Sequence, residues 1–360
     1  MGMSSCLGPL ITACAAFRAG IVRPRASVDV STFAPGDREP QPVAVYELPV
    51  STFGFSGVGR LVAIAMEALE DLATRVSLQT LGREAGVFLA LPDFSNGVGP
   101  KEAATAVGQL GRQVLGRALE GLGLSWPEDR WRFFTGGSAG FALALEAARR
   151  EMERRALETC IVGGLDSLVD PEHLRYLLGE HRLKTADNPV GIMPGEACAL
   201  LVLRSRQPGR KSEVNPPIEF AAAHIGNEPK PLGTKRRPDG LALSACVQAV
   251  LGTPSAGSGD VLLVSDLNGE EWRAWEWGSA LVRLKASGAL RGDELGWVPA
   301  TGFGDVGAAA GAVAACLAAR AFQRRYARAR RIVIVSQADS GERAAFTLVA
   351  RDTLGRGGRT

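Results

Sequence analysis

The central stretch of the chain, WRFFTGGSAGFALALEAARR, changes its hydrophobic pattern twice. Trp131–Phe134 is a short aromatic and apolar run, which is typical of a buried strand. Thr135–Gly140 is rich in glycine, and from Phe141 the composition changes to Ala, Leu and Glu, which favour a helix. The pattern predicts a strand, a tight corner and a helix. Such a corner presents backbone N–H groups and the positive end of a helix dipole, which stabilise negative charge.

Apolar spacing through the first half of the chain predicts strands that alternate with helices. The predicted strands lie within Met1–Leu10 and at Gly86–Leu91, Trp131–Phe134, Glu158–Val162 and Ala197–Leu203. The predicted helices are Ile11–Ala19, Arg60–Arg75, Lys101–Leu122, the segment from Phe141 onward, and Pro171–Gly179. We expect a turn at Gly163–Gly164. Val22–Pro49 is polar and rich in proline, which predicts irregular surface chain.

The second half of the chain repeats this order. The predicted strands are Ile218–His224, Val261–Asp266, Arg331–Val335 and Ala345–Val349, and Trp297–Thr301 leads into a second glycine corner. The predicted helices are Gly240–Leu251, Glu271–Ala286 and Ala308–Arg320. Because Arg204–Pro217 is basic and contains proline, we place the boundary there, which gives halves 1–205 and 206–360.

Three short segments of the first half are similar to segments of the second. Val87–Gly97 is similar to Val261–Gly269, and the corner Thr135–Gly140 is similar to Thr301–Asp305. Ala199–Leu203 is likewise similar to Phe346–Ala350. An internal duplication is the simplest interpretation.

Composition excludes several classes of function. The 360 residues are 46% hydrophobic and 22% charged, with a net charge of +3, which gives no indication of a nucleic acid or a membrane surface as partner. The six cysteines are scattered without a C-x-x-C pair, so we expect no disulfide framework and no metal site. No motif indicates a cofactor. The N-terminal segment does not have the pattern of a signal peptide, which predicts a cytoplasmic protein.

Several motifs resemble those of the β-ketoacyl synthases in the thiolase-like superfamily. Lys184–Leu203, KTADNPVGIMPGEACALLVL, resembles the signature in which a polar turn precedes P-G-E-G and an apolar strand. Gly304–Gly311 resembles the G-H-x-x-G-A-A-G motif, and Gly163–Ser167 resembles the glycine-pair turn. The spacing from Ser138 to Gly163 also resembles that from the family nucleophile to its glycine pair.

The resemblance implies an α/β fold in which two thiolase-like βαβαβαββ halves form a five-layered αβαβα sandwich, usually in a dimer. It implies that the nucleophile corner meets loops of the second half at the end of an acyl tunnel. The family reaction is a decarboxylative Claisen condensation. It uses a cysteine to carry the acyl chain, two histidines (or His and Asn) to stabilise the enolate, and a lysine.

The residues at those positions differ in this chain. A match of the helix without a gap places Gly137 at the nucleophile, whereas the spacing to Gly163 places Ser138 there. The first family histidine corresponds to Asn268, and the second to Asp305. Ser138, Asp305 and Asn268 are therefore the candidate catalytic residues.

The lysine and the oxyanion loop of the family also differ. The lysine position falls near Ala300, and the C-terminal G-F-G-G loop is replaced by Ala338–Gly341. The candidate corner and oxyanion residues are Gly137, Gly140, Gly304 and Ser340. A serine alcohol is a much weaker nucleophile than a thiol unless a base activates it. The loss of each oxyanion donor costs roughly 100- to 1000-fold in rate.

Each candidate also has a structural interpretation. Ser138 lies in a G-x-S-x-G pattern that fits either a nucleophile or a glycine-rich turn. Asp305 is either a base for Ser138 or the cap of the helix that follows. Asn268 is either a carbonyl donor or part of an Asn-Gly turn. Among the three histidines, His224 is expected in a strand, and His173 and His181 on the surface.

These residues lead to three hypotheses. The first is a catalytically degenerate β-ketoacyl-ACP synthase-like protein that acts as a non-condensing binding or scaffold subunit. It would form a homodimer, or a heterodimer with a related subunit in the manner of a chain-length factor, with an acyl carrier as a further possible partner. Arg18–Ile21 is also similar to shortened family members found near type VI secretion genes, which leaves a secretion-associated adaptor open.

The other two hypotheses are enzymes. One is a serine-dependent acyl hydrolase or acyltransferase that uses Ser138. The other is an atypical 3-oxoacyl-ACP synthase with a rearranged site that uses Cys160 or Cys198. The shape of the space between Ser138 and Asp305 distinguishes these hypotheses. An open acyl channel would favour binding or catalysis, and a filled space would favour a scaffold.

Overall fold

The computed structural model describes residues 1–33, 36, 38–48, 50–93, 100–206, 216–234, 236–253, 260–291 and 296–351. Two five-stranded sheets dominate it. The first sheet has the order β1-β7-β6-β4-β5 and the second β10-β9-β11-β12-β8. The strands of the first sheet are β1 (Gly2–Ser5), β4 (Gly86–Ala90), β5 (Trp131–Phe134), β6 (Thr159–Ser167) and β7 (Glu196–Arg204). Those of the second are β8 (Ile218–Asn227), β9 (Val261–Val264), β10 (Gly296–Trp297), β11 (Arg331–Gln337) and β12 (Glu342–Ala350).

The two sheets have the same topology. β8, β12, β11, β9 and β10 occupy the places of β1, β7, β6, β4 and β5. In each sheet the first two pairings of that series are antiparallel and the last two are parallel. The predicted duplication is therefore confirmed. The division at 205/206 stays a prediction, because β7 ends at Arg204, β8 begins at Ile218, and 207–215 lie outside the described residues.

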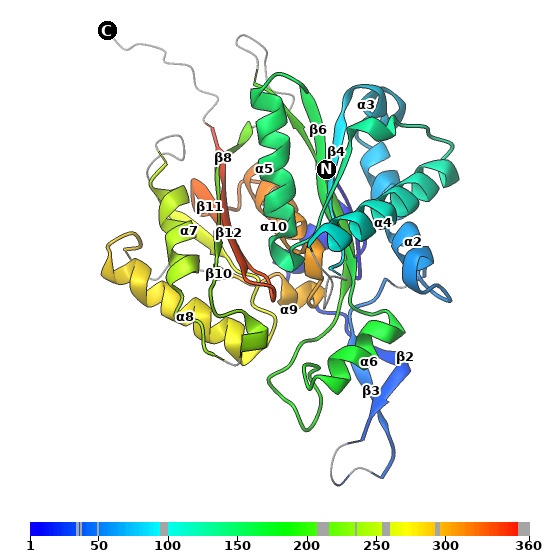
Figure 1. The fold of residues 1–360 in the computed structure, drawn as a ribbon, viewed down its shortest axis with the longest axis vertical. Coiled ribbons are helices and arrows are strands. Elements are labelled where there is room, and N and C mark those ends of the chain that lie inside the picture. Colours follow the sequence, from blue (N-terminus) through cyan, green and yellow to red (C-terminus); the bar gives the residue numbers. More distant parts are fainter. Residues whose placement is uncertain are drawn as a thin grey trace.

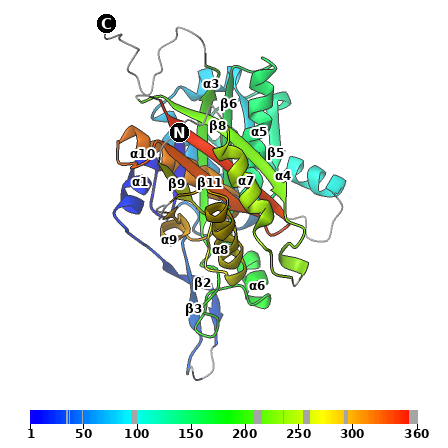
Figure 2. The ribbon, with the colours of Figure 1, turned by 90° about the vertical axis from the view of Figure 1, so that its left-hand side faces the viewer.

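Helices form three layers around these sheets, which gives five layers in all (Figure 1). The outer layer on the first sheet contains α2 (Gly57–Ala73), α3 (Leu78–Glu84) and α4 (Pro100–Gly121). The outer layer on the second contains α7 (Leu241–Leu251) and α8 (Glu271–Ala286). The central layer contains α5 (Gly140–Glu153) and α10 (Ala310–Gln323), with α1 (Leu10–Arg18) beside α10 (Figure 2).

Small residues allow the central helices to approach the sheets and each other. Every residue of α10 from Gly311 to Ala319 is buried. A Cβ atom at Gly311 would lie 2.9 Å from Cβ of Phe141 on α5, and one at Gly164 on β6 would lie 2.4 Å from the carbonyl oxygen of Ala308. The Ala-rich composition of this segment is therefore a packing requirement.

A buried carboxylate ties the first half together. Glu196, at the start of β7, accepts hydrogen bonds from the backbone N–H of Leu48, the hydroxyls of Thr52 and Ser167, and the guanidinium of Arg60. Its side chain has no exposed surface, so its charge requires these donors. The Glu of the P-G-E sequence therefore has a structural role.

Two expectations about local structure were wrong, and one helix was not predicted. Val22–Pro49 is not irregular throughout: β2 (Arg25–Thr32) and β3 (Gln41–Val45) form a hairpin that projects from the body (Figures 1 and 2). Its valines pack on α6 (Pro171–Gly179), a contact that local polarity does not encode. Gly163 and Gly164 lie within β6, because close packing and not a turn requires them. We did not anticipate α3.

Two kinds of feature are absent from the part of the chain that the structure describes. It contains no helix that is long and apolar enough to span a bilayer. It also contains no group of three or more His, Cys, Asp or Glu side chains arranged to hold a metal ion.

Gly164→Ala tests the packing of the central layer. A methyl group at this position would overlap the start of α10, so we expect the free energy of unfolding to fall by about 1–3 kcal/mol. The measurement is urea unfolding followed by circular dichroism. Gly116→Ala in α4 is the matched control, because its Cβ would meet no atom within 4 Å, and it should stabilise by up to about 1 kcal/mol. Equal effects of the two variants would contradict this account.

Candidate functional site

The two glycine corners meet at the centre of the molecule. The 3-10 turns η2 (Gly137–Ala139) and η5 (Gly307–Ala309) precede α5 and α10, and the two turns contact each other. Gly137 and Gly307 have the same left-handed φ of 49°, a conformation that favours glycine. The corners are therefore equivalent in both position and backbone conformation.

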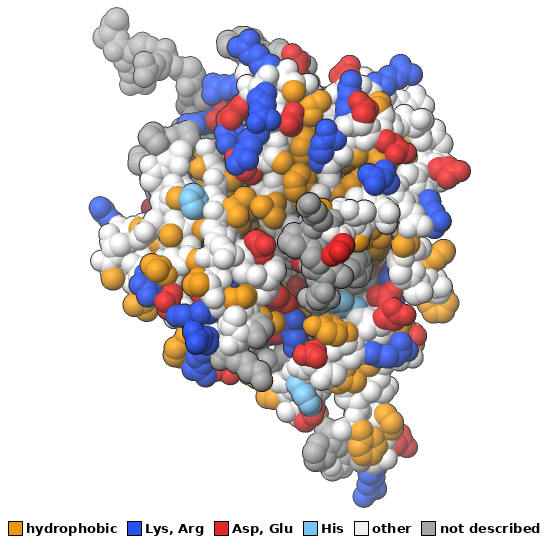
Figure 3. All heavy atoms as spheres, in the orientation of Figure 1, with side chains coloured by type: hydrophobic (Ala, Val, Ile, Leu, Met, Phe, Trp, Pro, Cys, Tyr) orange, Lys and Arg blue, Asp and Glu red, His pale blue; other side chains and the backbone are white. Residues whose placement is uncertain are grey.

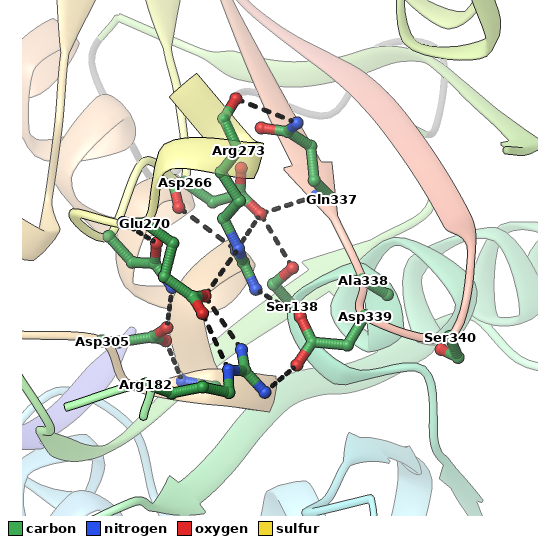
Figure 4. Close-up of polar contacts among 12 residues, drawn as sticks. Ser138, Arg182, Asp266, Glu270, Arg273, Asp305, Gln337, Ala338, Asp339 and Ser340 are labelled. Carbon is green, nitrogen blue, oxygen red and sulfur yellow. Dashed lines mark hydrogen bonds and ion pairs between the residues drawn. The ribbon is translucent and has the colours of Figure 1, made fainter. Parts of the chain in front are cut away.

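Ser138 points into the junction, but its partner is not the one that we expected. Its Oγ donates to Oδ2 of Asp266 at 2.8 Å (Figure 4). The same oxygen accepts the backbone N–H of Gln337 at 2.6 Å and Nη1 of Arg273 at 2.9 Å. The hypothesis that Asp305 pairs with Ser138 is wrong, because Asp266 holds that place at the end of β9.

Asn268 and Asp305 do come together, at 2.7 Å from Nδ2 to Oδ2. The same amide nitrogen also donates to Glu270 at 3.0 Å, so both of its N–H groups have an acceptor. Oδ1 of Asp305 accepts the backbone N–H of Gly307 at 2.9 Å. Asp305 therefore holds the start of η5, which agrees with its interpretation as a cap.

Two arginines link these groups into one network. Arg182 forms two hydrogen bonds to Glu270, at 2.7 and 2.9 Å, and an ion pair with Asp339 at 2.7 Å. Arg273 connects Asp266 to Asp339, at 2.9 and 3.2 Å. Burial alone would lower the pKa of both arginines, but the facing carboxylates outweigh it and raise the pKa of each. Both guanidinium groups therefore stay charged.

Two buried carboxyls border this network. Burial raises the pKa of Asp166 to about 7, against the backbone hydrogen bonds from Ala308 and Ser167. Burial also raises the pKa of Asp266, although Arg273 opposes it. Oδ1 of Asp266 is buried and has no hydrogen-bond partner among the described residues.

A small cavity adjoins this network. Among the described residues it is lined in part by Asp266, Asn268, Asp305 and Ala310, and its volume is about 20 Å³. This volume holds about one water molecule. The side chains of the network lie where the two corners meet, which is where the resemblance implied the end of an acyl tunnel.

Other candidate residues lie outside the network or have structural roles. Ser340 is exposed, its Oγ bonds to Glu342, and Figure 4 shows it turned away from Ser138. The assignment of Ser340 to an oxyanion role is therefore not supported by its position. A Cβ at Gly140 would lie 3.1 Å from Cβ of Ala90, and one at Gly304 would lie 2.7 Å from the carbonyl oxygen of Met193.

No cysteine lies in the network. All six cysteines are buried. Burial raises the pKa of Cys160 to about 12 and raises that of Cys198 as well, so neither thiol ionises readily. Neither of these strand residues hydrogen-bonds to the network. Their assignment as nucleophiles in a rearranged site has no support in this geometry.

The histidines are also outside the hydrogen-bonded network. His224 and His181 are exposed. His173 is half-buried, so its expected place on the open surface was wrong, and burial lowers its pKa against the opposing charge of Asp305.

Most of the network was missed from the sequence. The residues that we did not single out are Asp166, Arg182, Asp266, Glu270, Arg273, Gln337 and Asp339. One signal in the sequence could have found two of these residues. Asp266 and Gln337 lie at or just after the carboxyl ends of two neighbouring parallel strands, and such ends meet at one edge of a sheet.

Asp166 gives the junction a defined pH dependence. Its pKa is 3.8 in an unfolded chain and about 7 in the folded one, so the folded state keeps the proton to higher pH. Its contribution to the free energy of unfolding therefore falls as pH rises from about 4 to about 7. We therefore expect the free energy of unfolding of Asp166→Asn, measured in urea relative to that of the wild type, to rise by about 2–4 kcal/mol between about pH 4 and about pH 7.

Asp187→Asn is the control, because it also replaces a carboxyl group by an amide. A hydrogen bond from Thr185 lowers the pKa of the exposed Asp187, so any change with pH should have the opposite sign. A stability difference between Asp166→Asn and wild type that stays constant with pH would contradict the buried-carboxyl account.

Comparison with solved structures shows the fold of the chain. No protein-family model and no curated protein sequence matches the chain. Among solved structures, the ishigamide ketosynthase/chain length factor has a TM-score of 0.64 at 19% identity, over 98% of both chains. The oxazolomycin ketosynthase domain KS7 of Streptomyces albus JA3453 has a TM-score of 0.73 at 14% identity, over 98% of this chain and 74% of its own.

A third structure is a complex. It is a type II polyketide synthase acyl-carrier protein in complex with its ketosynthase, and it matches with a TM-score of 0.69 at 14% identity, over 97% of this chain and 98% of that chain. Identities this low establish the fold and not an activity. With its duplicated five-layered sandwich and these neighbours, the chain has the thiolase-like ketosynthase fold.

Proposed function

We propose that this chain is a catalytically degenerate β-ketoacyl synthase homologue that acts as a non-condensing binding or scaffold subunit. The observation that carries the proposal is the network between the two corners. Arg182 and Arg273 bind carboxylates at the junction where the family's acyl chain would end. The cavity beside Asp266 and Asp305 has a volume of only about 20 Å³.

The first chemical argument concerns the nucleophile. Acyl transfer requires a thiolate, or an alcohol whose proton a free base removes. Ser138 donates to Asp266, but that carboxylate oxygen also accepts from Arg273 and from Gln337. Three donors on one oxygen stabilise its negative charge, which reduces its capacity to take a proton from the serine.

The second argument concerns the negative charge that develops during condensation. An enolate or oxyanion needs donors aimed at it. Both N–H groups of Asn268 are already bonded, and Asp305 would place a carboxylate where the family has a histidine. A carboxylate at that point repels a developing anion. The site therefore opposes the transition state instead of stabilising it.

The kind of partner follows from the neighbouring structures. One neighbour is a ketosynthase/chain length factor, and another is a ketosynthase in complex with an acyl-carrier protein. We infer for this chain a dimer, either with itself or with a related subunit, and an acyl carrier as a further partner. Pairing in the manner of a chain-length factor fits these neighbours better than a secretion-associated adaptor does.

The direct test is a condensation assay. We expect purified protein, mixed with acyl- and malonyl-carrier substrates, to form no 3-oxoacyl product detectable by mass spectrometry. Ser138→Cys should be equally inactive, because a new thiol would still face Arg273 and Asp266 at the junction. An authentic ketosynthase is the positive control, and product formation by the wild-type chain would overturn the proposal.

A second function is favoured by one observation, the hydrogen bond from Ser138 to Asp266 at 2.8 Å. Burial raises the pKa of Asp266, which makes it a stronger base than an exposed carboxylate. A serine-dependent acyl hydrolase or acyltransferase would use this pair. The bonds from Arg273 and Gln337 to Asp266 weigh against it, so it stays the alternative.

A fluorophosphonate probe distinguishes the two functions. For a non-condensing subunit we expect no covalent labelling of the native chain at any pH between 5 and about 9. Labelling that Ser138→Ala abolishes would establish the hydrolase alternative. Ser340→Ala is the matched control, because its hydroxyl is exposed and lies outside the network.

A further inference from the structure

The C-terminal ends of the two central helices carry equivalent arginines. α5 and α10 each have 14 residues and follow equivalent corners. Superposing them residue by residue pairs Arg150 with Arg320, Arg154 with Arg324, and Arg155 with Arg325. Arg155 and Arg325 even share a left-handed φ of 57°. The duplication thus provides an internal comparison of two similar surfaces.

The chain neutralises two of the three compared arginines at the end of α5 with its own carboxylates. Arg150 pairs with Glu146 at 2.8 Å, and Arg154 with Glu151 at 3.6 Å. Figure 3 shows basic and acidic side chains side by side over this end of α5. These pairs are exposed and intrahelical, so they mainly balance charge at the helix end.

The equivalent glutamate positions of α10 carry no charge. Cys316, Ala321 and Gln323 stand where α5 has Glu146, Glu151 and Glu153. From Arg320 to Arg331 the sequence contains six arginines and no Asp or Glu. The excess positive charge therefore belongs to the surface of α10 and not to the fold that both helices share.

We call Arg18, Arg324, Arg325 and Arg328 the α10 arginine surface. All four side chains are exposed, and none has a carboxylate within ion-pair distance among the described residues. Arg18 comes from α1, which lies beside α10 (Figure 2), and its guanidinium lies 4.3 Å from the ring centroid of Tyr326. This contact holds the guanidinium group of Arg18, at the end of α1, against the segment that follows α10.

Two exposed apolar side chains follow Arg18 within four residues of the chain. Ile21 and Val22 follow α1 directly and are 41% and 54% exposed. Exposed apolar groups next to unneutralised cations match a partner segment that has one acidic and one apolar face. We propose that the α10 arginine surface docks an acidic amphipathic helix of a partner protein.

Two features favour a protein over the other polyanions. Binding of single-stranded nucleic acid uses open aromatic faces, but the Tyr326 ring is covered by Arg18 and lies 6.2 Å from the Trp297 ring. The whole chain has a net charge of only +3, which gives weak long-range attraction to a membrane or to DNA. The proposal does not depend on whether the junction condenses acyl groups.

The test uses the full chain and a fluorescein-labelled helical peptide with Glu on one face and Leu on the other. We expect fluorescence anisotropy to show binding at low salt that weakens at about 0.3 M salt. Arg324→Glu with Arg325→Glu should weaken it about tenfold or more. The matched control, Arg154→Glu with Arg155→Glu, makes the same charge change at equivalent backbone positions and should alter binding less than about threefold.

Circular dichroism and the thermal midpoint of both double variants show whether they are folded. Equal loss of binding in the two double variants would mean attraction to net charge alone and would overturn the proposal. So would the absence of peptide binding at low salt. Tighter binding of oligo-dT or of phosphatidylserine vesicles, lost in Arg324→Glu with Arg325→Glu, would assign the surface to that polyanion instead.

Discussion

Two guanidinium groups hold the junction of the two halves together. Arg182 and Arg273 bind Asp266, Glu270 and Asp339, and Asn268 extends the network to Asp305. Removal of Arg273 would take the ion-pair partner from the buried carboxylate of Asp266, which typically costs about 3–5 kcal/mol. The network also crosses between the halves, because Arg182 belongs to the first and its partners to the second. The network therefore adds polar contacts between the halves to the apolar packing of α5 and α10 in the central layer.

Comparison of the two halves distinguishes the features that packing requires from the features that differ between the halves. Strand order, strand direction and the left-handed corner glycines are the same in both halves. The corner side chains differ, with Ser138 in one turn and Ala308 in the other, and so does the charge at the ends of α5 and α10. A change at these positions leaves the sheets and the central helices intact. For that reason a scaffold of this kind retains its fold when its surface or its reactive groups change.

Periodicity predicted most strands and helices because each buries one regular face. Pro171–Gly179 and Glu271–Ala286 agree with the structure at both ends. The hairpin of β2 and β3 could not be predicted, because its valines find their partners on α6, far along the chain. The candidate site was predicted only in part. Ser138, Asn268 and Asp305 do meet at the junction, but the pairing of Ser138 with Asp266 depends on where β9 ends relative to β11, which no local pattern specifies.

Asp305 has a structural role that does not depend on any catalytic role. Its backbone N–H donates to Met193, its carbonyl accepts from Gly195, and its carboxylate accepts the N–H of Gly307. These bonds fix the second corner whatever the side chain does to a substrate. An aspartate satisfies the corner as well as any hydrogen-bond acceptor would. The geometry of the second corner therefore depends on two backbone bonds and one side-chain acceptor, and a different acceptor that reached the N–H of Gly307 would keep the same corner.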